Sequence, residues 1–182
     1  LVEGSETFTI TLSNPTGGAV LGPTSSATVT ITDNDSTVGF APTTLGVSEA
    51  GPNGTLTVTR TGSAATAAAV NWAASNGAAL AGSDFGTSGS ALQKTGTLTW
   101  AAGDGAAKTI SVGPTATAGA WVGVLNDALI EGPETFNVTL SAPTGGMVLG
   151  AGATVAVVTI TSDDRGVTMA SSTQSVAESA GT

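Results

Sequence analysis

The sequence predicts an all-β protein that folds as a two-sheet antiparallel sandwich. Short segments alternate apolar and polar residues with a period of two, as in Phe136, Val138 and Leu140, which are separated by polar residues. Turns are supplied by 26 glycines and 7 prolines, while Thr and Val favour half-buried pleated surface. No segment carries the apolar stripe of an amphipathic helix. Together these observations predict seven or eight short strands joined by glycine-rich turns.

The alternation places each strand in turn. The expected strands are a first strand broken between 38–40 and 45–47, and then 55–59, 70–72, 97–100, 110–112, 121–125, 135–140 and 154–161. Residues 73–93 are loop-like, and 113–119 form a loop insertion. The large aromatic side chains are expected in the core or at its edge: Trp72, Phe85, Trp100 and Phe136. Trp121 lies beside the insertion, which leaves open a carbohydrate-stacking surface, although packing is the commoner role for such a residue.

The chain contains an internal sequence repeat. Residues 1–8 match residues 129–136, and 47–49 match 176–178, at offsets of 128 and 129. The chain therefore divides into the end of one repeat (1–35), a whole repeat (36–164) and the start of a third (165–182). We expect a tandem array in the parent protein, of which this chain is a piece.

Composition excludes several classes of function. The net charge is -9, from 13 acids and only 4 scattered bases, which argues against a nucleic-acid surface. Cys and His are absent, so disulfides, thiolate or imidazole metal sites and His-dependent nucleophilic catalysis are excluded. No apolar run is long enough to span a membrane, and no signal peptide is recognisable after Leu1. The absence of Cys is consistent with an exported bacterial protein.

Acidic residues gather at recurring places. Asp127, Glu131 and Glu134 precede a strand, and Gly132 and Pro133 supply the turn between the two glutamates. Seven acids of the whole repeat lie at strand ends or in loops: Glu49, Asp84, Asp127, Glu131, Glu134, Asp163 and Asp164. Because strand ends alternate between the two poles of a sandwich, these seven are expected to converge on one pole, with Asp104 at the other.

Converging carboxylates predict a cation. Like charges repel strongly unless a cation lies among them, and a flexible cage of many oxygens suits Ca²⁺ better than Mg²⁺. Five further acids belong to the neighbouring repeats and join the predicted metal ligands: Glu3, Glu6, Asp33, Asp35 and Glu178. The alternative is that all are solvated turn residues that maintain solubility.

The motifs resemble those of a Calx-beta domain. They are Val47-Ser48-Glu49, Gly82-Ser83-Asp84-Phe85, Gly96-Thr97-Leu98-Thr99-Trp100, the stretch from Asn126 to Phe136, and Thr159 to Asp164. This family occurs in regulatory loops of sodium/calcium exchangers, in integrin beta-4 and in large bacterial surface proteins. The resemblance implies an immunoglobulin-like sandwich with calcium at one pole, held by the seven acids of the whole repeat. Asn126 and Ser162 replace acids of the regulatory members, which implies fewer ions or weaker binding.

The resemblance leads to a functional hypothesis. We expect a structural segment of a large extracellular or cell-surface bacterial adhesin or filament, made rigid by Ca²⁺ at the junctions between repeats. Its partners would be neighbouring repeats or like chains in an array, without nucleic acid or membrane insertion. The alternatives are a glycan- or protein-binding module, or a spacer attached to a secreted enzyme. Within these residues no substrate cleft is signalled, so catalysis is not expected.

Overall fold

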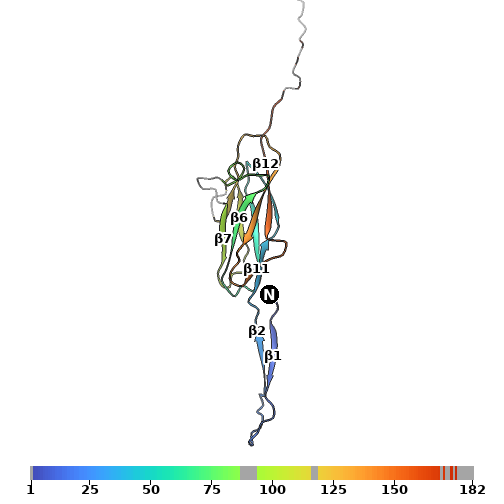
Figure 1. Cartoon of the computed structure of the whole chain (residues 1–182), viewed down its shortest axis with the longest axis vertical. Helices are drawn as coiled ribbons and strands as arrows, with labels where there is room; N and C mark the ends of the chain where they lie inside the picture. The colour runs from blue at the N-terminus through green and yellow to red at the C-terminus, as the bar shows by residue number, and fades with distance from the viewer. Residues whose placement is uncertain are drawn as a thin grey trace, which may run out of the picture.

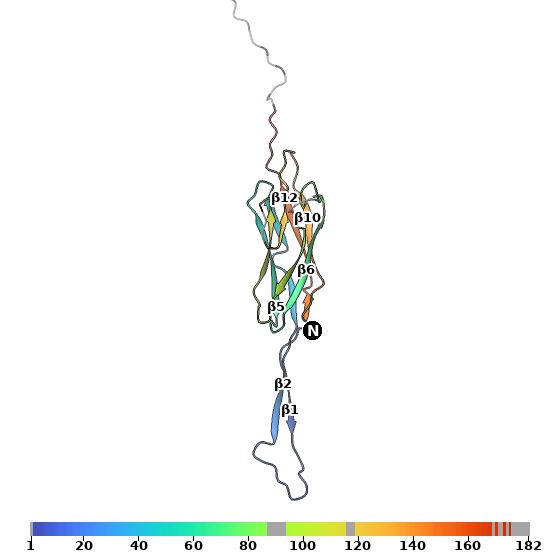
Figure 2. The ribbon, with the colours of Figure 1, turned by 90° about the vertical axis from the view of Figure 1, so that its left-hand side faces the viewer.

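A computed structural model describes residues 2–86, 94–115, 119–168, 170, 173 and 175. The described residues form strands and loops, arranged as a β-sandwich with a β-hairpin at one end and the C-terminal segment leaving the other (Figure 1). In a view turned by 90°, the hairpin and the sandwich remain in line along the long axis (Figure 2). None of the described residues belongs to a helix of the length and apolarity needed to cross a membrane.

Two five-stranded sheets make up the sandwich. The first has the order β4 (Thr44–Ser48), β12 (Val155–Thr161), β10 (Glu134–Ser141), β6 (Ala68–Asn76) and β7 (Thr95–Trp100). The second has the order β11 (Met147–Leu149), β3 (Ser36–Phe40), β5 (Gly54–Gly62), β8 (Lys108–Gly113) and β9 (Trp121–Gly123). The predicted all-β sandwich is confirmed.

Two details of the prediction were wrong. The described part of the sandwich has ten strands rather than seven or eight, because the broken first strand is two strands in opposite sheets and the short strand β11 was not expected. The sandwich is also not purely antiparallel, since β4 pairs with β12, β3 with β11 and β8 with β9 in parallel. The chain crosses between the sheets after Phe40, and this crossing sets β3 and β4 alongside late strands that run in the same direction.

The core lies between the two sheets, as the period-two pattern requires. Phe136, Val138 and Leu140 all point inward and are buried. Phe85 reaches the core from the loop after β6, and its ring stacks on Phe136 with centroids 4.3 Å apart. Trp121 is only 8% exposed, so a carbohydrate-stacking surface at this position is wrong: the ring is used for packing.

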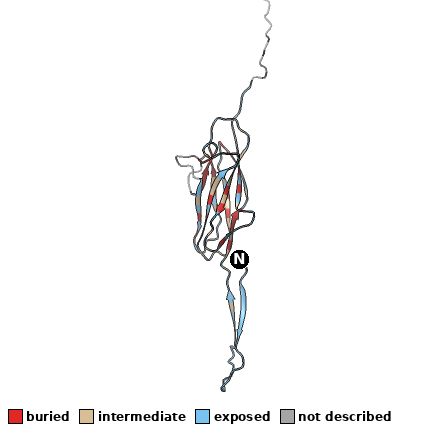
Figure 3. Cartoon of the chain, viewed as in Figure 1, coloured by how far each residue is buried: buried red, intermediate tan, exposed pale blue. Residues whose placement is uncertain are grey.

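The N-terminal hairpin has the same strand pairing as β10 and β12 but is not packed against a second sheet. Strands β1 (Glu6–Thr11) and β2 (Ser26–Ile31) pair antiparallel as a separate two-stranded sheet. Their register matches that of β10 and β12, since Glu6 lies opposite Ile31 as Glu134 lies opposite Ile160. Burial differs sharply: the hairpin strands are mostly exposed, whereas buried residues lie along the sandwich strands (Figure 3). Phe8 is 49% exposed, whereas its counterpart Phe136 is fully buried.

Backbone hydrogen bonds hold the junction between the hairpin and the sandwich in place. The amide of Ser63 donates to the carbonyl of Asp35 at 2.9 Å, and the amide of Ser36 donates to the carbonyl of Gly146 at 3.2 Å. Gly62 has a φ of 102°, and a side chain there would collide with the Asp35 carbonyl. The hairpin therefore leaves the sandwich directly from β3, without a free linker.

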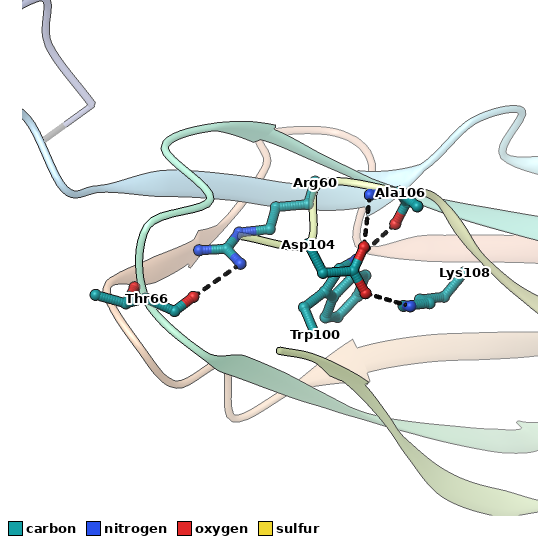
Figure 4. Close-up of polar contacts among 6 residues, drawn as sticks. All are labelled: Arg60, Thr66, Trp100, Asp104, Ala106 and Lys108. Atoms are coloured by element: carbon teal, nitrogen blue, oxygen red, sulfur yellow. Dashed lines mark hydrogen bonds and ion pairs between the residues drawn. The ribbon is translucent and has the colours of Figure 1, made fainter. Parts of the chain in front are cut away.

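A buried arginine organises this end of the sandwich. Arg60 donates from Nε to Ser36 Oγ at 3.1 Å and from Nη1 to the carbonyl of Thr66 at 3.0 Å. Asp104 lies nearby and pairs with Lys108 at 2.7 Å (Figure 4). The hydrogen bond from Lys108 is the main reason why the pKa of Asp104 is lowered, and Arg60 contributes. Asp104 thus lies at the hairpin end of the sandwich.

Candidate metal centre

Three carboxylates from distant parts of the chain meet at the end of the sandwich away from the hairpin. Glu49, Asp127 and Asp164 each offer one oxygen, and these oxygens all lie within 4.8 Å of one another. Glu49 follows β4, and Asp164 comes shortly after β12. Because β4 and β12 are parallel neighbours, their C-terminal ends meet at the same edge, where the Glu49 amide donates to the Thr161 carbonyl at 3.1 Å.

The loop before β10 brings the third carboxylate. Asp127 Oδ1 accepts a hydrogen bond from the Leu129 amide at 2.7 Å, which folds the loop into a turn. Ser162 Oγ donates to the Leu129 carbonyl at 3.3 Å and accepts from the Asp164 amide at 3.1 Å. Ser162 therefore connects the Asp127 loop to the segment that carries Asp164.

A second group of acids adjoins the first. Asp84 lies in the loop after β6, where its Oδ2 accepts from the Leu80 amide at 2.6 Å and its carbonyl accepts from the Leu125 amide at 2.9 Å. Glu134 begins β10, and Glu131 lies just before it. Glu131 connects the two groups electrostatically, because Asp84, Asp127 and Asp164 all raise its pKa after the main cause, desolvation.

Crowding makes the ionised state costly. Burial raises the pKa of Glu49 above its ordinary value of 4.5, and the neighbouring carboxylates Glu131, Asp127, Asp164 and Asp163 raise it further. The pKa of Glu134 is also raised, first by desolvation and then by Asp84 and Glu131. All seven acids predicted from the sequence thus lie at or beside one end of the sandwich and act on one another's charge.

The donor set fits a hard divalent cation. Glu49 is only 5% exposed, and its Oε2 is buried without a hydrogen-bond partner. Asp164 Oδ2 is likewise buried without a partner. Buried polar atoms are nearly always satisfied in folded proteins, and two unsatisfied carboxylate oxygens at one acidic site are what an oxygen-liganded ion would satisfy. The role of the seven acids as ligands nevertheless stays a prediction.

Four of the remaining predicted ligands lie elsewhere. Glu3, Glu6, Asp33 and Asp35 line a hollow of about 230 Å³ where the hairpin meets the sandwich. Asp33 accepts backbone hydrogen bonds from Asp35 at 2.8 Å and Glu3 at 2.6 Å, and these bonds lower its pKa. Glu178 lies outside the described residues.

Ser162 is the functional residue that sequence reasoning missed. The sequence indicates only the loss of an acid at this position, whereas in the structure the hydroxyl connects two segments of the site. The Ser-x-Asp spacing of Ser162 and Asp164, which is typical of a side-chain-to-backbone turn, is the signal that identifies this role.

Comparisons with known proteins agree with this architecture. The family model of the Calx-beta domain matches residues 1–35 and 33–164. Among solved structures, the chain is similar to the apo form of the Calx CBD1 domain, with 25% identity and a TM-score of 0.59, over 71% of this chain and 99% of that one. It is also similar to the calcium binding domain CBD12 of CALX1.1, with 26% identity and a TM-score of 0.57, over 70% of this chain and 46% of that one.

A further solved structure, the Calx CBD2 domain, is 15% identical with a TM-score of 0.53 over 68% of this chain and 85% of that one, and supports the fold alone. No curated protein sequence matches the chain. The family match covers both the hairpin and the whole sandwich, and the chain therefore belongs to the Calx-beta family.

Proposed function

We propose that this chain is a structural repeat segment of a large extracellular bacterial adhesin or filament, and that Ca²⁺ binds at the acidic end of each repeat and stiffens the junction with the next one. The observation that carries the proposal is the cluster of Glu49, Asp127 and Asp164, whose oxygens lie within 4.8 Å and include two buried, unpartnered atoms. Such a cluster is unfavourable without a cation and becomes a ligand set with one.

The position of the cluster supports a mechanical role. Asp163 and Asp164 lie immediately after β12, on the segment that leaves the sandwich toward residue 165. A cation held by Asp164 together with Glu49 and Asp127 would tie this exit to the end of β4 and to the loop before β10. Bending at the exit would then require breaking metal–ligand contacts, so the junction would be stiffer with the ion than without it.

Calcium is the favoured ion for two reasons. The ligands are carboxylates on loops and strand ends, which suit the flexible, many-oxygen coordination of Ca²⁺ better than the strict octahedron of Mg²⁺. In addition, the similar structure of CBD12 of CALX1.1 is described as a calcium binding domain. Extracellular calcium modules bind with dissociation constants on the order of 10⁻⁴ to 10⁻³ M. A site of that strength fills outside a cell and empties inside, so the repeat would stiffen on export.

The N-terminal hairpin supports the array. It carries the same register as β10 and β12 and lies in line with the sandwich. The residues that join it to the sandwich, Asp35 and Ser36, are hydrogen-bonded to Ser63, Gly146 and Arg60 and do not form a free linker. The end of one repeat thus runs directly into the next, as a rod of repeats requires.

Thermal unfolding with calcium and with chelator tests the proposal. Calcium at about tenfold its dissociation constant stabilises a single site by about 1.4 kcal/mol, which corresponds to a rise in Tm of roughly 4–8 °C for a domain of this size. Asp104→Asn is the matched control, because Asp104 is an acid at the other end of the sandwich and is already paired with Lys108. This variant should keep the full calcium-induced shift. If the Tm of the parent protein stays unchanged in about 10 mM calcium, roughly tenfold the weakest expected dissociation constant, the proposed ion is excluded and the chain is a spacer without it.

A further inference from the structure

The first sheet of the sandwich ends in a regular edge strand. Strand β7 pairs with β6 on one side and is the last strand in the order of its sheet (Figure 1). Its six residues pair with β6 without interruption, so no bulge bends this edge away from a neighbour. Gly96 lies within the strand because a side chain there would collide with the indole of Trp72, at 2.9 Å. The glycine thus serves packing inside the sandwich, and β7 is a regular edge over its whole length.

The outward-facing backbone groups of β7 belong to its three threonines. The amide of Ala74 donates to the carbonyl of Lys94 at 2.7 Å, which makes these two residues a hydrogen-bonded pair. Such pairs recur at every second residue of an antiparallel ladder, so the backbone N–H and C=O groups of Thr95, Thr97 and Thr99 point away from β6. All three threonines are exposed. Within the part of the chain that the structure describes, these outward backbone groups have no hydrogen-bond partner.

The other edges of the sandwich have features that oppose pairing. Among the described strands, β9 and β11 have only three residues each, and β4 ends next to the acidic cluster that contains Glu49. Short edge strands and charged residues are common means by which proteins prevent edge-to-edge association. Strand β7 contains neither a charged residue nor a proline, and its whole repeat is present. It is therefore the longest and least protected edge of the described sandwich.

We propose that β7 pairs antiparallel with β7 of a second copy of the chain, about a two-fold axis at Thr97. Thr97 then lies opposite Thr97 of the second copy, and Thr95 lies opposite Thr99. Every outward N–H of the three threonines faces a carbonyl in this register, which gives about six backbone hydrogen bonds across the contact. The contact is self-complementary, because both copies contribute the same residues. The two five-stranded sheets become one continuous sheet.

The charges beside β7 favour the antiparallel orientation. Lys94 immediately precedes the strand, and Asp104 lies in the turn that follows it, where its amide donates to the Ala101 carbonyl at 3.0 Å. In the antiparallel pair, Lys94 of one copy lies opposite Trp100 of the other, on the side of the turn that carries Asp104. Opposite charges are therefore brought toward each other at both ends of the contact. A parallel pair would place the two Lys94 side chains next to each other, which is unfavourable.

The contact is weak for a single copy and stronger for a repeat array. It uses one strand of each copy and buries less than the roughly 800 Å² per partner of a standard interface, so the dimer is concentration-dependent. Cross-strand threonine pairs on the exposed sheet face add to the backbone hydrogen bonds. In a tandem array, which the proposed function assumes, the same contact recurs along two chains, and this repetition strengthens their lateral association.

Sedimentation of the full chain at concentrations up to roughly 1 mM tests the proposal. In about 0.15 M salt, which screens the net charge of -9, the mass should rise from 17.3 kDa to about twice that value and stop there. Thr97→Pro should stay monomeric because it removes the central outward N–H, and it should still fold because that N–H has no partner within the sandwich. Thr97→Lys should also stay monomeric, because it sets like charges opposite each other.

Two control variants isolate the edge and its backbone. Thr139→Lys makes the same substitution on the same sheet face but two strands away from the edge, and it should associate like the parent protein. Thr97→Val keeps the backbone groups and removes the hydroxyl, so it should associate as well. The fluorescence of Trp72 and Trp100 reports that the sandwich stays folded in each variant.

The orientation has its own test, since the chain has no cysteine. A short bifunctional thiol reagent should link a mixture of Thr95→Cys and Thr99→Cys faster than it links either variant to itself. A monomer at every concentration, growth beyond the dimer, association of Thr97→Pro at the parent level, or faster linkage of each cysteine variant to itself would each overturn the proposal. No predicted calcium ligand lies on β7, so the dimer should form equally in chelator and in calcium, and its failure is independent of the calcium result.

Discussion

Replacing Glu49 by Gln should have opposite effects on the two forms of the protein. Without calcium, the variant should be more stable than the parent protein at neutral pH, because a crowded and buried charge is removed. With calcium, it should lose most of the stabilisation that the ion provides, because an anionic ligand is removed while side-chain size is nearly kept. Both expectations follow from the 4.8 Å cluster of Glu49, Asp127 and Asp164.

The magnitude can be worked from that separation. Two unit charges 4.8 Å apart repel by about 0.9 kcal/mol in bulk water and by about 3.5 kcal/mol at an effective dielectric constant near 20. Glu49 faces two such neighbours, but Asp127 is exposed and screened by solvent, and the buried Gln amide still needs partners. The net gain for the calcium-free variant is therefore about 1–3 kcal/mol.

Chemical denaturation at neutral pH, in chelator and in calcium, measures both effects. The gain in chelator should disappear below the ordinary carboxyl pKa of 4.5, where the parent Glu49 is protonated and uncharged. A Glu49→Gln variant that is no more stable than the parent protein in chelator would refute the electrostatic reasoning. A variant that keeps the full calcium-induced gain would refute the assignment of Glu49 as a ligand.

Three further predictions concern pH, the junction and the core. The pKa values of Glu49, Glu131 and Glu134 are raised in the folded state, so the calcium-free protein should lose stability as the pH rises from about 4.5 through these pKa values. Calcium should reverse this loss of stability. Denaturation midpoints measured at pH 5 and pH 7.5, with and without calcium, check both expectations. Arg60→Met should lower the free energy of unfolding by about 1–3 kcal/mol, because it leaves buried hydrogen-bond acceptors unpaired. Arg60→Lys should not recover this stability, because one ammonium group cannot replace a guanidinium that donates to both Ser36 and Thr66. Urea unfolding measures both variants. Phe136→Ala should cost about 3–5 kcal/mol, whereas Phe8→Ala at the same repeat position should cost under about 1 kcal/mol in sandwich unfolding monitored by tryptophan fluorescence.

Period-two alternation predicted the longer strands because each has one buried face. In β10, for example, Phe136, Val138 and Leu140 are buried and the residues between them are not. The same signal misses β11, because three residues are too few to show a period. The parallel pairings also have no local signature, since they depend on where a late strand such as β12 lies when the chain closes.

The site was more predictable than the strand pairing. Acids at strand ends and in loops must lie at a pole of a sandwich, and the internal repeat indicated which of them recur. The details that set their spacing were not predictable, because they depend on hydrogen bonds between segments. Ser162 shows this: its hydroxyl connects Leu129 to Asp164, a contact that requires the folded positions of both loops.

The hairpin shows which features are set by the two strands themselves and which depend on the rest of the fold. Glu6 and Glu134 lie opposite equivalent isoleucines, so the pairing register is set by the strands and follows the repeat. Burial, by contrast, is not set by two strands alone: Phe136 is buried because the other strands of the sandwich cover its face, whereas Phe8 lies in a pair of strands without such a cover.

The acids at the two ends of the sandwich have different surroundings, and this difference supports the proposed ion site. Asp104 has a cation from the protein itself, Lys108 at 2.7 Å, and the resulting hydrogen bond lowers its pKa. At the other end, burial and four neighbouring carboxylates all raise the pKa of Glu49. Among the described residues, the fold thus pairs Asp104 with a cation of its own and crowds seven carboxylates at the opposite end, where the proposed ion would offset their repulsion. A divalent cation bound by oxygen would both neutralise this end and satisfy the unpartnered oxygens of Glu49 and Asp164.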